Sequence, residues 1–308
     1  MNRCPITYEL CGNKKYSENG LRLLSKKLQN LHDFPYTPKE QIELALQSAS
    51  KLSIQGIQPK LSVVLNVAKE RFDMVERGGG FIFKPPHHIY EEVPQNEDVT
   101  MRLAHMAGIE IPLHGMVYNI DGSFTYFIQR FDRLPGGGKV AVEDFSQLMD
   151  VPRDTKYESS MEKLIPVIDK NCTFPVLEKL KLFRLTIFCF LVGNEDMHLK
   201  NFSLINREGK VELSPAYDLL NTTIILKKPQ EEFALPIKGK KSKINRSDIF
   251  DYFGKERLRL NDTTIQHEMD RFKSLFPSWE SRLKESFLTE SVRSHYLNLI
   301  QARFDRLF

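Results

Sequence analysis

The chain carries the stretch Gly193-Asn194-Glu195-Asp196-Met197-His198-Leu199-Lys200-Asn201-Phe202, and further on it continues as Leu213-Ser214-Pro215-Ala216-Tyr217-Asp218. In the first stretch Asn201 follows Asp196 by five positions, and the second stretch ends on another aspartate. The apolar run before Gly193 predicts a buried helix that ends at this glycine. A polar loop that leaves such a helix is held rigidly, as a loop that carries chemistry must be.

An aspartate, an asparagine five residues later and a second aspartate beyond a short hairpin form the layout of a phosphotransferase site. In protein kinases the first aspartate takes the proton of the attacking hydroxyl, and the other two residues hold magnesium on the ATP phosphates. Oxygen ligands suit this role because Mg²⁺ is a hard cation. The spacing therefore predicts Asp196 as the catalytic base and Asn201 and Asp218 as metal ligands. Asp218 is not followed by Phe-Gly, so the alternative is that it caps a turn.

A candidate for the phosphate-contacting lysine lies upstream, at the end of the strand-like segment Phe81-Ile82-Phe83-Lys84. Kinases fix such a lysine with a glutamate on the next helix, and it contacts the α- and β-phosphates. We predict this role for Lys84 and a pairing with Glu97; the alternative is an exposed strand-end lysine. His198, inside the loop, either orients Asp196 or is a packed loop histidine.

A phosphate-covering loop should precede this strand, but the chain has neither Gly-x-Gly-x-x-Gly nor a Walker sequence. The place is taken by Ser53-Ile54-Gln55-Gly56-Ile57-Gln58-Pro59-Lys60. One glycine among small polar residues can still wrap phosphates with backbone N–H groups. The alternative is an ordinary Gly/Pro turn before a strand.

Strand-like segments dominate the first part of the chain and helical ones the second. We expect strands at 61–67 and 81–84 and a hairpin at 114–120 and 124–130, with helices over 17–49 and 96–107. Further helices are expected at 143–149, 158–170, 175–192, 246–253 and 262–274, with a last pair over about 278–306 and short strands at 202–206 and 210–214. The pattern predicts an α+β, two-lobed, protein-kinase-like fold: a strand-rich N-lobe over 1–135 and a mostly helical C-lobe over 136–308.

The composition is that of an ordinary globular protein. The chain has 308 residues, 41% of them hydrophobic and 27% charged, and a net charge of +4, which is too small to indicate nucleic-acid binding by itself. Its four cysteines include no Cys-x₂-Cys pair, so we expect free thiols and a reducing compartment. The polar N-terminus predicts no secretory signal, and no apolar run reaches the roughly 20 residues of a spanning helix. We expect a cytoplasmic protein.

Six blocks of the sequence together resemble the HipA-like serine/threonine kinases, the toxins of bacterial toxin–antitoxin modules. They are 53–60, Phe83-Lys84-Pro85, Arg130-Phe131-Asp132-Arg133, Glu143-Asp144-Phe145-Ser146-Gln147, 194–203 and 214–221. The resemblance implies ATP and Mg²⁺ as cofactors, with nucleotide contacts from Ser53, Ile54, Gln55, Gly56, Lys84, Gln129, Arg130, Phe131, His198 and Lys200. It also implies a protein substrate such as an aminoacyl-tRNA synthetase, whose phosphorylation arrests growth.

Two departures from the family pattern refine this expectation. Longer HipA proteins have an N-terminal subdomain before the helices seen here, so the chain resembles the shorter HipT type. That type implies a small companion protein in place of the subdomain, a helix-turn-helix antitoxin, and DNA contact only through the antitoxin. Short relatives often have Ser-x-Ser in the phosphate loop, whereas Gln55 stands here at the second position, which leaves Ser53 as the expected autophosphorylation site. The alternative for Ser53 is that it caps a turn.

Two other functions fit parts of the same pattern. A catalytically silent kinase-like scaffold in a repressor complex would keep the fold, although the presence of Lys84, Asp196, Asn201 and Asp218 argues against it. A small-molecule phosphotransferase would use the same Asp-x₄-Asn spacing, and it would need a deep acidic substrate pocket in the helical half.

Overall fold

The computed structural model describes residues 1–49, 59–134, 136–226 and 231–308, and the chain divides into two compact units. The first consists of Met1–Val99, Pro112–Arg130 and Glu285–Leu288. The second consists of Thr100–Ile111, Phe131–Lys284 and Thr289–Phe308. The lobe boundary at 135 remains a prediction. In the structure the longest stretch of the second unit begins at Phe131, directly after Arg130 of the first unit.

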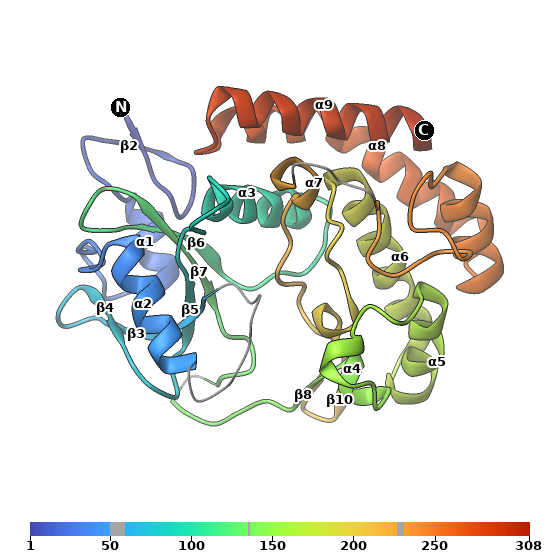
Figure 1. Cartoon of the computed structure of the whole chain (residues 1–308), viewed down its shortest axis with the longest axis horizontal. Helices are drawn as coiled ribbons and strands as arrows, with labels where there is room; N and C mark the ends of the chain where they lie inside the picture. The colour runs from blue at the N-terminus through green and yellow to red at the C-terminus, as the bar shows by residue number, and fades with distance from the viewer. Residues whose placement is uncertain (50–58, 135, 227–230) are drawn as a thin grey trace. The chain divides into compact units, whose positions relative to one another are not determined.

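The first unit is built on a five-stranded antiparallel sheet (Figure 1). The strand order is β4 (Arg71–Met74), β3 (Leu61–Asn66), β5 (Phe81–Lys84), β7 (Phe124–Gln129) and β6 (His114–Tyr118). Two short strands, β1 (Asn2–Arg3) and β2 (Leu10–Gly12), pair with each other near the N-terminus. The central strand β5 is therefore hydrogen-bonded on both sides, with Lys84 opposite Tyr126.

The core of the first unit lies on one face of this sheet. Phe81 and Phe83 of β5 belong to it, together with Leu21 of helix α1 (Glu18–Leu24) and Ala45 of helix α2 (Pro38–Ala49). Side chains alternate between the two faces of a strand, so Lys84 belongs to the opposite face. Helix α3 (Val93–Met106) supplies the residue that meets Lys84 there.

The second unit is mostly helical, and its longest buried element is α6 (Pro175–Val192). Helices α8 (Asp262–Glu285) and α9 (Glu290–Leu307) follow one another at the C-terminal end (Figure 1). The other helical elements are α4 (Phe145–Leu148), η1 (Arg153–Thr155), α5 (Met161–Asn171), η2 (Leu199–Asn201), α7 (Thr222–Ile225) and the π-helix η3 (Ser247–Arg257). A three-stranded antiparallel sheet has the order β10 (Lys210–Leu213), β9 (Ser203–Arg207), β8 (Val142–Asp144).

The 17–49 segment, expected to be helical, forms two helices with a non-helical connection between them, and the second begins at Pro38, where Thr37 and Glu40 form a capping box. Two expectations about the elements were wrong. Strand β4 lies where only a connection between two strands was expected. Helix α8 continues through Pro277 and so joins two expected helices, because the buried Phe272 and Trp279 hold it on either side of the proline. Within the described residues no helix has both the length and the apolar character needed to cross a membrane.

Candidate active site

Helix α6 delivers the 194–201 loop to a fixed position. Its C-cap, Gly193, has φ 75°, and Asn194 donates its N–H to the carbonyl of Cys189 at 2.9 Å. Only glycine adopts this backbone conformation at low cost. A Cβ on Gly193 would lie 2.6 Å from Leu299 Cδ2 and 2.7 Å from Asn221 Oδ1, so the loop leaves the helix through a crowded point.

Asp196 and Asn201 are joined directly within this loop. The amide nitrogen of Asn201 donates to the main-chain carbonyl of Asp196 at 2.8 Å, and the N–H of His198 donates to the same carbonyl at 2.9 Å. The side chain of Asn194 accepts from the N–H of Asp196 at 3.1 Å. The backbone of Asp196 is thus fixed by bonds to its N–H and its carbonyl, while the residue stays partly exposed.

Asp218 is one of nine non-glycine residues with positive φ among those that the structure describes. Its φ is 55°, in the left-handed region that non-glycine residues rarely adopt. The neighbouring Tyr217 donates its hydroxyl to the carbonyl of Lys200 at 2.8 Å and lies 2.6 Å from the Ser203 hydroxyl. These contacts hold the second loop against the first, next to Asn201. Strained conformations of this kind often occur at functional sites.

His198 lies under the influence of both aspartates. Burial lowers the pKa of His198 below its ordinary value, and the charge of Lys156 lowers it further, while the charges of Asp196 and Asp218 act in the opposite direction. The ammonium of Lys156 lies 2.7 Å from His198 Nε2. A neutral imidazole can accept that hydrogen bond, and the cation beside it disfavours protonation.

Tyr157 is a site residue that the sequence analysis missed. Its hydroxyl donates to Asp196 Oδ1 at 2.5 Å, and its ring meets the His198 ring edge-on with centroids 5.1 Å apart. Burial, and then the hydrogen bond and charge of Asp196, raise the pKa of Tyr157, so it remains a protonated donor at neutral pH. A tyrosine in a loop 39 residues upstream carries no local signal of this contact.

The lysine of the first unit forms a buried ion pair. Lys84 Nζ bonds the Glu97 carboxylate, and the two side chains are only 3% and 1% exposed. Lys84 Nζ also lies 5.5 Å from the centre of the Tyr126 ring, the cross-strand neighbour on β7. The alternative, an exposed strand-end lysine, is therefore wrong, and Glu97 is the partner of Lys84, as predicted. Contact with phosphate remains a prediction.

The other predicted nucleotide-contacting residues fall into three groups. Ser53, Ile54, Gln55 and Gly56 lie outside the described residues. In the first unit, Gln129 ends β7 with an exposed side chain, and Arg130 donates its N–H to the carbonyl of Gly80 at 2.8 Å. In the second unit, the Phe131 ring lies 5.7 Å from that of Tyr217, and Lys200 forms an ion pair with Asp144 at 2.6 Å.

The residue types at this loop fit a magnesium–nucleotide site. Asn201 uses its amide nitrogen toward Asp196, so its oxygen is the end left for a cation. Together with the Asp218 carboxylate this gives two hard oxygen donors. The described residues include no group of three or more His, Cys, Asp or Glu arranged to hold a metal. Mg²⁺ needs no such group, since it is commonly bound by one or two carboxylates with waters and substrate phosphates.

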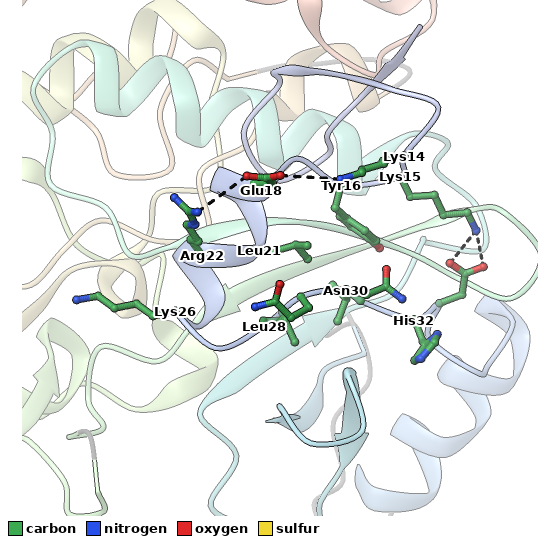
Figure 2. A pocket seen from close by; sticks show the side chains of 13 residues that line it. Lys14, Lys15, Tyr16, Glu18, Leu21, Arg22, Lys26, Leu28, Asn30 and His32 are labelled. Carbon is green, nitrogen blue, oxygen red and sulfur yellow. Dashed lines mark hydrogen bonds and ion pairs between the residues drawn. The ribbon is translucent and has the colours of Figure 1, made fainter.

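A hollow lies in each unit, and Glu195 of the loop borders the second. A cavity of about 790 Å³ in the first unit is bordered by α1 and the 26–33 segment (Figure 2). Its wall carries the Lys15–Asp33 ion pair at 2.6 Å and Glu18 between Lys14 and Arg22. One of about 580 Å³ in the helical unit has both charge signs in its wall: Glu195, Glu231, Glu232, Lys243, Arg303 and Arg306. Neither is the deep acidic pocket that a small-molecule phosphotransferase would need.

The sequence matches the family described as HipA-like C-terminal domain over residues 52–279. The match covers most of the chain, so the protein belongs to this family. "Putative kinase Y4dM" of Sinorhizobium fredii is 31% identical over 274 residues, which are 82% of this chain and 65% of that protein. "Putative kinase" of Haemophilus influenzae is 29% identical over 221 residues, which are 68% of this chain and 64% of that protein. The matches thus span slightly less than two thirds of these relatives.

Named toxins and solved structures are also similar. The serine/threonine-protein kinase toxin HipA of Shewanella oneidensis is 29% identical over 192 residues, 56% of this chain and 43% of that protein. A chain in the Shewanella oneidensis MR-1 toxin–antitoxin complex of HipA, HipB and operator DNA superposes with a TM-score of 0.70, at 22% identity, over 91% of this chain and 72% of its own length. The Helicobacter pylori proinflammatory kinase CtkA superposes with a TM-score of 0.54 at 14% identity, over 74% of this chain and 87% of that chain. The fold is therefore the two-lobed, α+β, protein-kinase-like fold of HipA.

Proposed function

We propose that the protein is a serine/threonine protein kinase that transfers the γ-phosphate of ATP to a hydroxyl group of another protein. The observation that carries the proposal is the Asp196–Asn201 loop. Its carboxylate is held at a partly exposed position and already accepts a hydrogen bond from a hydroxyl group, that of Tyr157. A serine or threonine hydroxyl of a substrate has the same donor chemistry.

In the proposed reaction, Asp196 accepts the hydrogen bond of the substrate hydroxyl and then its proton. The carboxylate has two oxygens with about four acceptor positions, so the substrate hydroxyl can bind while Tyr157 stays in place. Asn201 and His198 both donate to the main-chain carbonyl of Asp196 and so fix the backbone that carries the base. General-base assistance of this kind contributes about 10²–10⁴-fold to the rate.

The cofactors that fit are ATP and Mg²⁺, and when bound they supply the phosphoryl group and neutralise its charge. Asn201 Oδ1 and the Asp218 carboxylate are the proposed metal ligands. Lys84 is the proposed phosphate contact, and Glu97 holds its ammonium group at the sheet surface. Gln129, Arg130 and Phe131 are proposed to receive the adenine, and His198 and Lys200 to lie near the phosphates.

The biological setting is proposed from the relatives. HipA of Shewanella oneidensis is named a toxin, and a similar solved structure contains HipB and operator DNA. We place this protein in a toxin–antitoxin module with a helix-turn-helix antitoxin, DNA contact only through that antitoxin, and a small companion protein. The substrate is proposed to be a protein such as an aminoacyl-tRNA synthetase. Ser53 is proposed to be autophosphorylated, and mass spectrometry after incubation with Mg·ATP tests this.

The central test compares the wild-type protein with Asp196→Asn. Each is incubated with γ-labelled ATP, Mg²⁺ and a bacterial extract, and the labelled proteins are identified. The wild type should label a protein, and Asp196→Asn should not, although it should still bind ATP. Asp262→Asn, which changes an exposed aspartate at the start of α8, is the matched control and should label like the wild type. Equal labelling by Asp196→Asn and the wild type would remove the catalytic assignment.

A further inference from the structure

One short segment contacts the Asp196–Leu199 part of the loop at four points. The Tyr157 hydroxyl donates to Asp196 Oδ1 at 2.5 Å, and the Tyr157 ring lies edge-on to His198. The Lys156 ammonium lies 2.7 Å from His198 Nε2, and the Lys156 carbonyl accepts from the N–H of Leu199 at 3.3 Å. Backbone, aromatic and polar contacts thus come from only two consecutive residues.

The two residues also support each other. Lys156 Nζ lies 4.9 Å from the centre of the Tyr157 ring, so the ammonium is shared between this ring and His198. The segment follows the short η1 helix, where Glu158 donates its N–H to the carbonyl of Thr155 at 2.8 Å. Tyr157 is 40% exposed and Asp196 is partly exposed, so this hydrogen bond lies where solvent reaches the loop.

The Tyr157 hydroxyl hydrogen-bonds one oxygen of the Asp196 carboxylate, Oδ1, and leaves the other, Oδ2, for a second donor. A carboxylate held by a single C–C bond can rotate, and rotation would turn the free oxygen away from an arriving hydroxyl. A hydrogen bond to Oδ1 fixes that rotation without using Oδ2. Misplacement of a reacting group by about 1 Å can cost roughly 10²-fold in rate.

We propose that Lys156 and Tyr157 are positioning residues for the phosphotransfer: Tyr157 fixes the rotation of the Asp196 carboxylate so that Oδ2 faces the substrate hydroxyl, and Lys156 fixes the His198 ring that packs against Tyr157. This inference rests on the proposed kinase function. It assigns no proton transfer to either residue.

The test uses Tyr157→Phe, which removes the hydroxyl and keeps the ring against His198. Tyr252→Phe is the matched control. Tyr252 lies on η3 and not in the loop, and it also hydrogen-bonds a carboxylate, that of Glu162 on α5. The rate of label transfer from γ-labelled Mg·ATP into extract protein is measured over a range of ATP concentrations. Tyr157→Phe should lower kcat by about 10- to 100-fold while KM for ATP changes by less than about 2-fold. Tyr252→Phe should leave both unchanged.

Two further measurements exclude a merely structural effect. The stoichiometry of bound ATP and the Tm of Tyr157→Phe should match the wild type, which shows that the protein is folded and binds nucleotide.

Lys156→Met should lower kcat in the same direction, and Lys156→Arg, which keeps a cationic donor, should recover part of the loss. A wild-type kcat for Tyr157→Phe, or a loss of kcat matched by a loss of bound ATP, overturns the inference and leaves the kinase proposal standing. An inactive wild type overturns the kinase proposal, and this inference with it.

Discussion

At the scale of single residues, Asp218 and Lys84 occupy states that cost free energy. The left-handed backbone of Asp218 is unfavourable for any L-residue, although aspartate and asparagine tolerate it better than others because their side chains bond locally. Lys84 and Glu97 are charges almost removed from water. The desolvation of two buried charges often exceeds their mutual attraction. Such costs are accepted at sites where the groups serve function.

A prediction at Asp218 separates its backbone from its charge. Asp218→Asn keeps a residue that tolerates the left-handed region, so its Tm should stay near that of the wild type, while Mg·ATP binding weakens because an anionic metal ligand is lost. Asp218→Ala should weaken binding equally and also lower the free energy of unfolding by about 1 kcal/mol relative to Asp218→Asn. Isothermal titration with Mg·ATP and thermal unfolding measure the two effects. Wild-type Mg·ATP affinity in Asp218→Asn would contradict the metal-ligand role.

A prediction at the Lys84–Glu97 pair separates stability from function. Lys84→Met leaves Glu97 as a buried charge without this partner and should cost about 3–5 kcal/mol of unfolding free energy. Replacing both, as Lys84→Met with Glu97→Leu, should restore most of that stability because apolar residues fill the same space. The double variant should still fail to transfer phosphate, since the cation is gone. Denaturant unfolding and label transfer test this, and an active double variant would exclude Lys84 from the site.

At the scale of elements, the end of α6 determines where the loop begins. Gly193 and Gly209 both have positive φ, but a Cβ on Gly193 would approach Leu299 to 2.6 Å, whereas nothing lies within 4 Å of one on Gly209. Gly209→Ala should therefore show the backbone cost alone, about 1–2 kcal/mol. Gly193→Ala should lose more than this and should also reduce phosphotransfer, because Asn221 and Thr223 must move. If Gly193→Ala loses no more stability than Gly209→Ala and keeps full activity, the crowding around Gly193 does not constrain the loop.

The elements also show what the sequence can and cannot predict. Helix α6 was predicted with its observed bounds, because a long apolar run ending in glycine is a strong signal. The order Lys84, Asp196, Asn201, Asp218 could likewise be recognised, because spacing along the chain is visible in a sequence. Strand β4 was missed because only two of its four residues, Arg71-Phe72-Asp73-Met74, are apolar, whereas the equally short β5 begins with three apolar residues. Tyr157 was missed because its contact with Asp196 depends on tertiary packing alone.

At the scale of the whole molecule, family membership and the fold rest on most of the chain, whereas activity rests on a few side chains. A kinase-like scaffold and an active kinase would share the sheet, helices α6 and α9, and the buried core. They would differ in what the loop between Asp196 and Asn201 does. The fold alone therefore cannot separate the two, and a functional comparison of nearly identical proteins is needed.

Bacterial growth provides that comparison. Expression of the wild-type chain alone should slow growth, because phosphorylation of an essential protein would accumulate, and Asp196→Asn should not slow it at equal protein level. Asp262→Asn, the exposed control, should slow growth as the wild type does. Growth curves with quantified expression provide the measurement. The Tm of all three proteins is measured as well, and equal values exclude misfolding as the cause of a difference in growth. If the wild type and Asp196→Asn slow growth equally, the effect comes from binding, and the scaffold function takes precedence over the kinase.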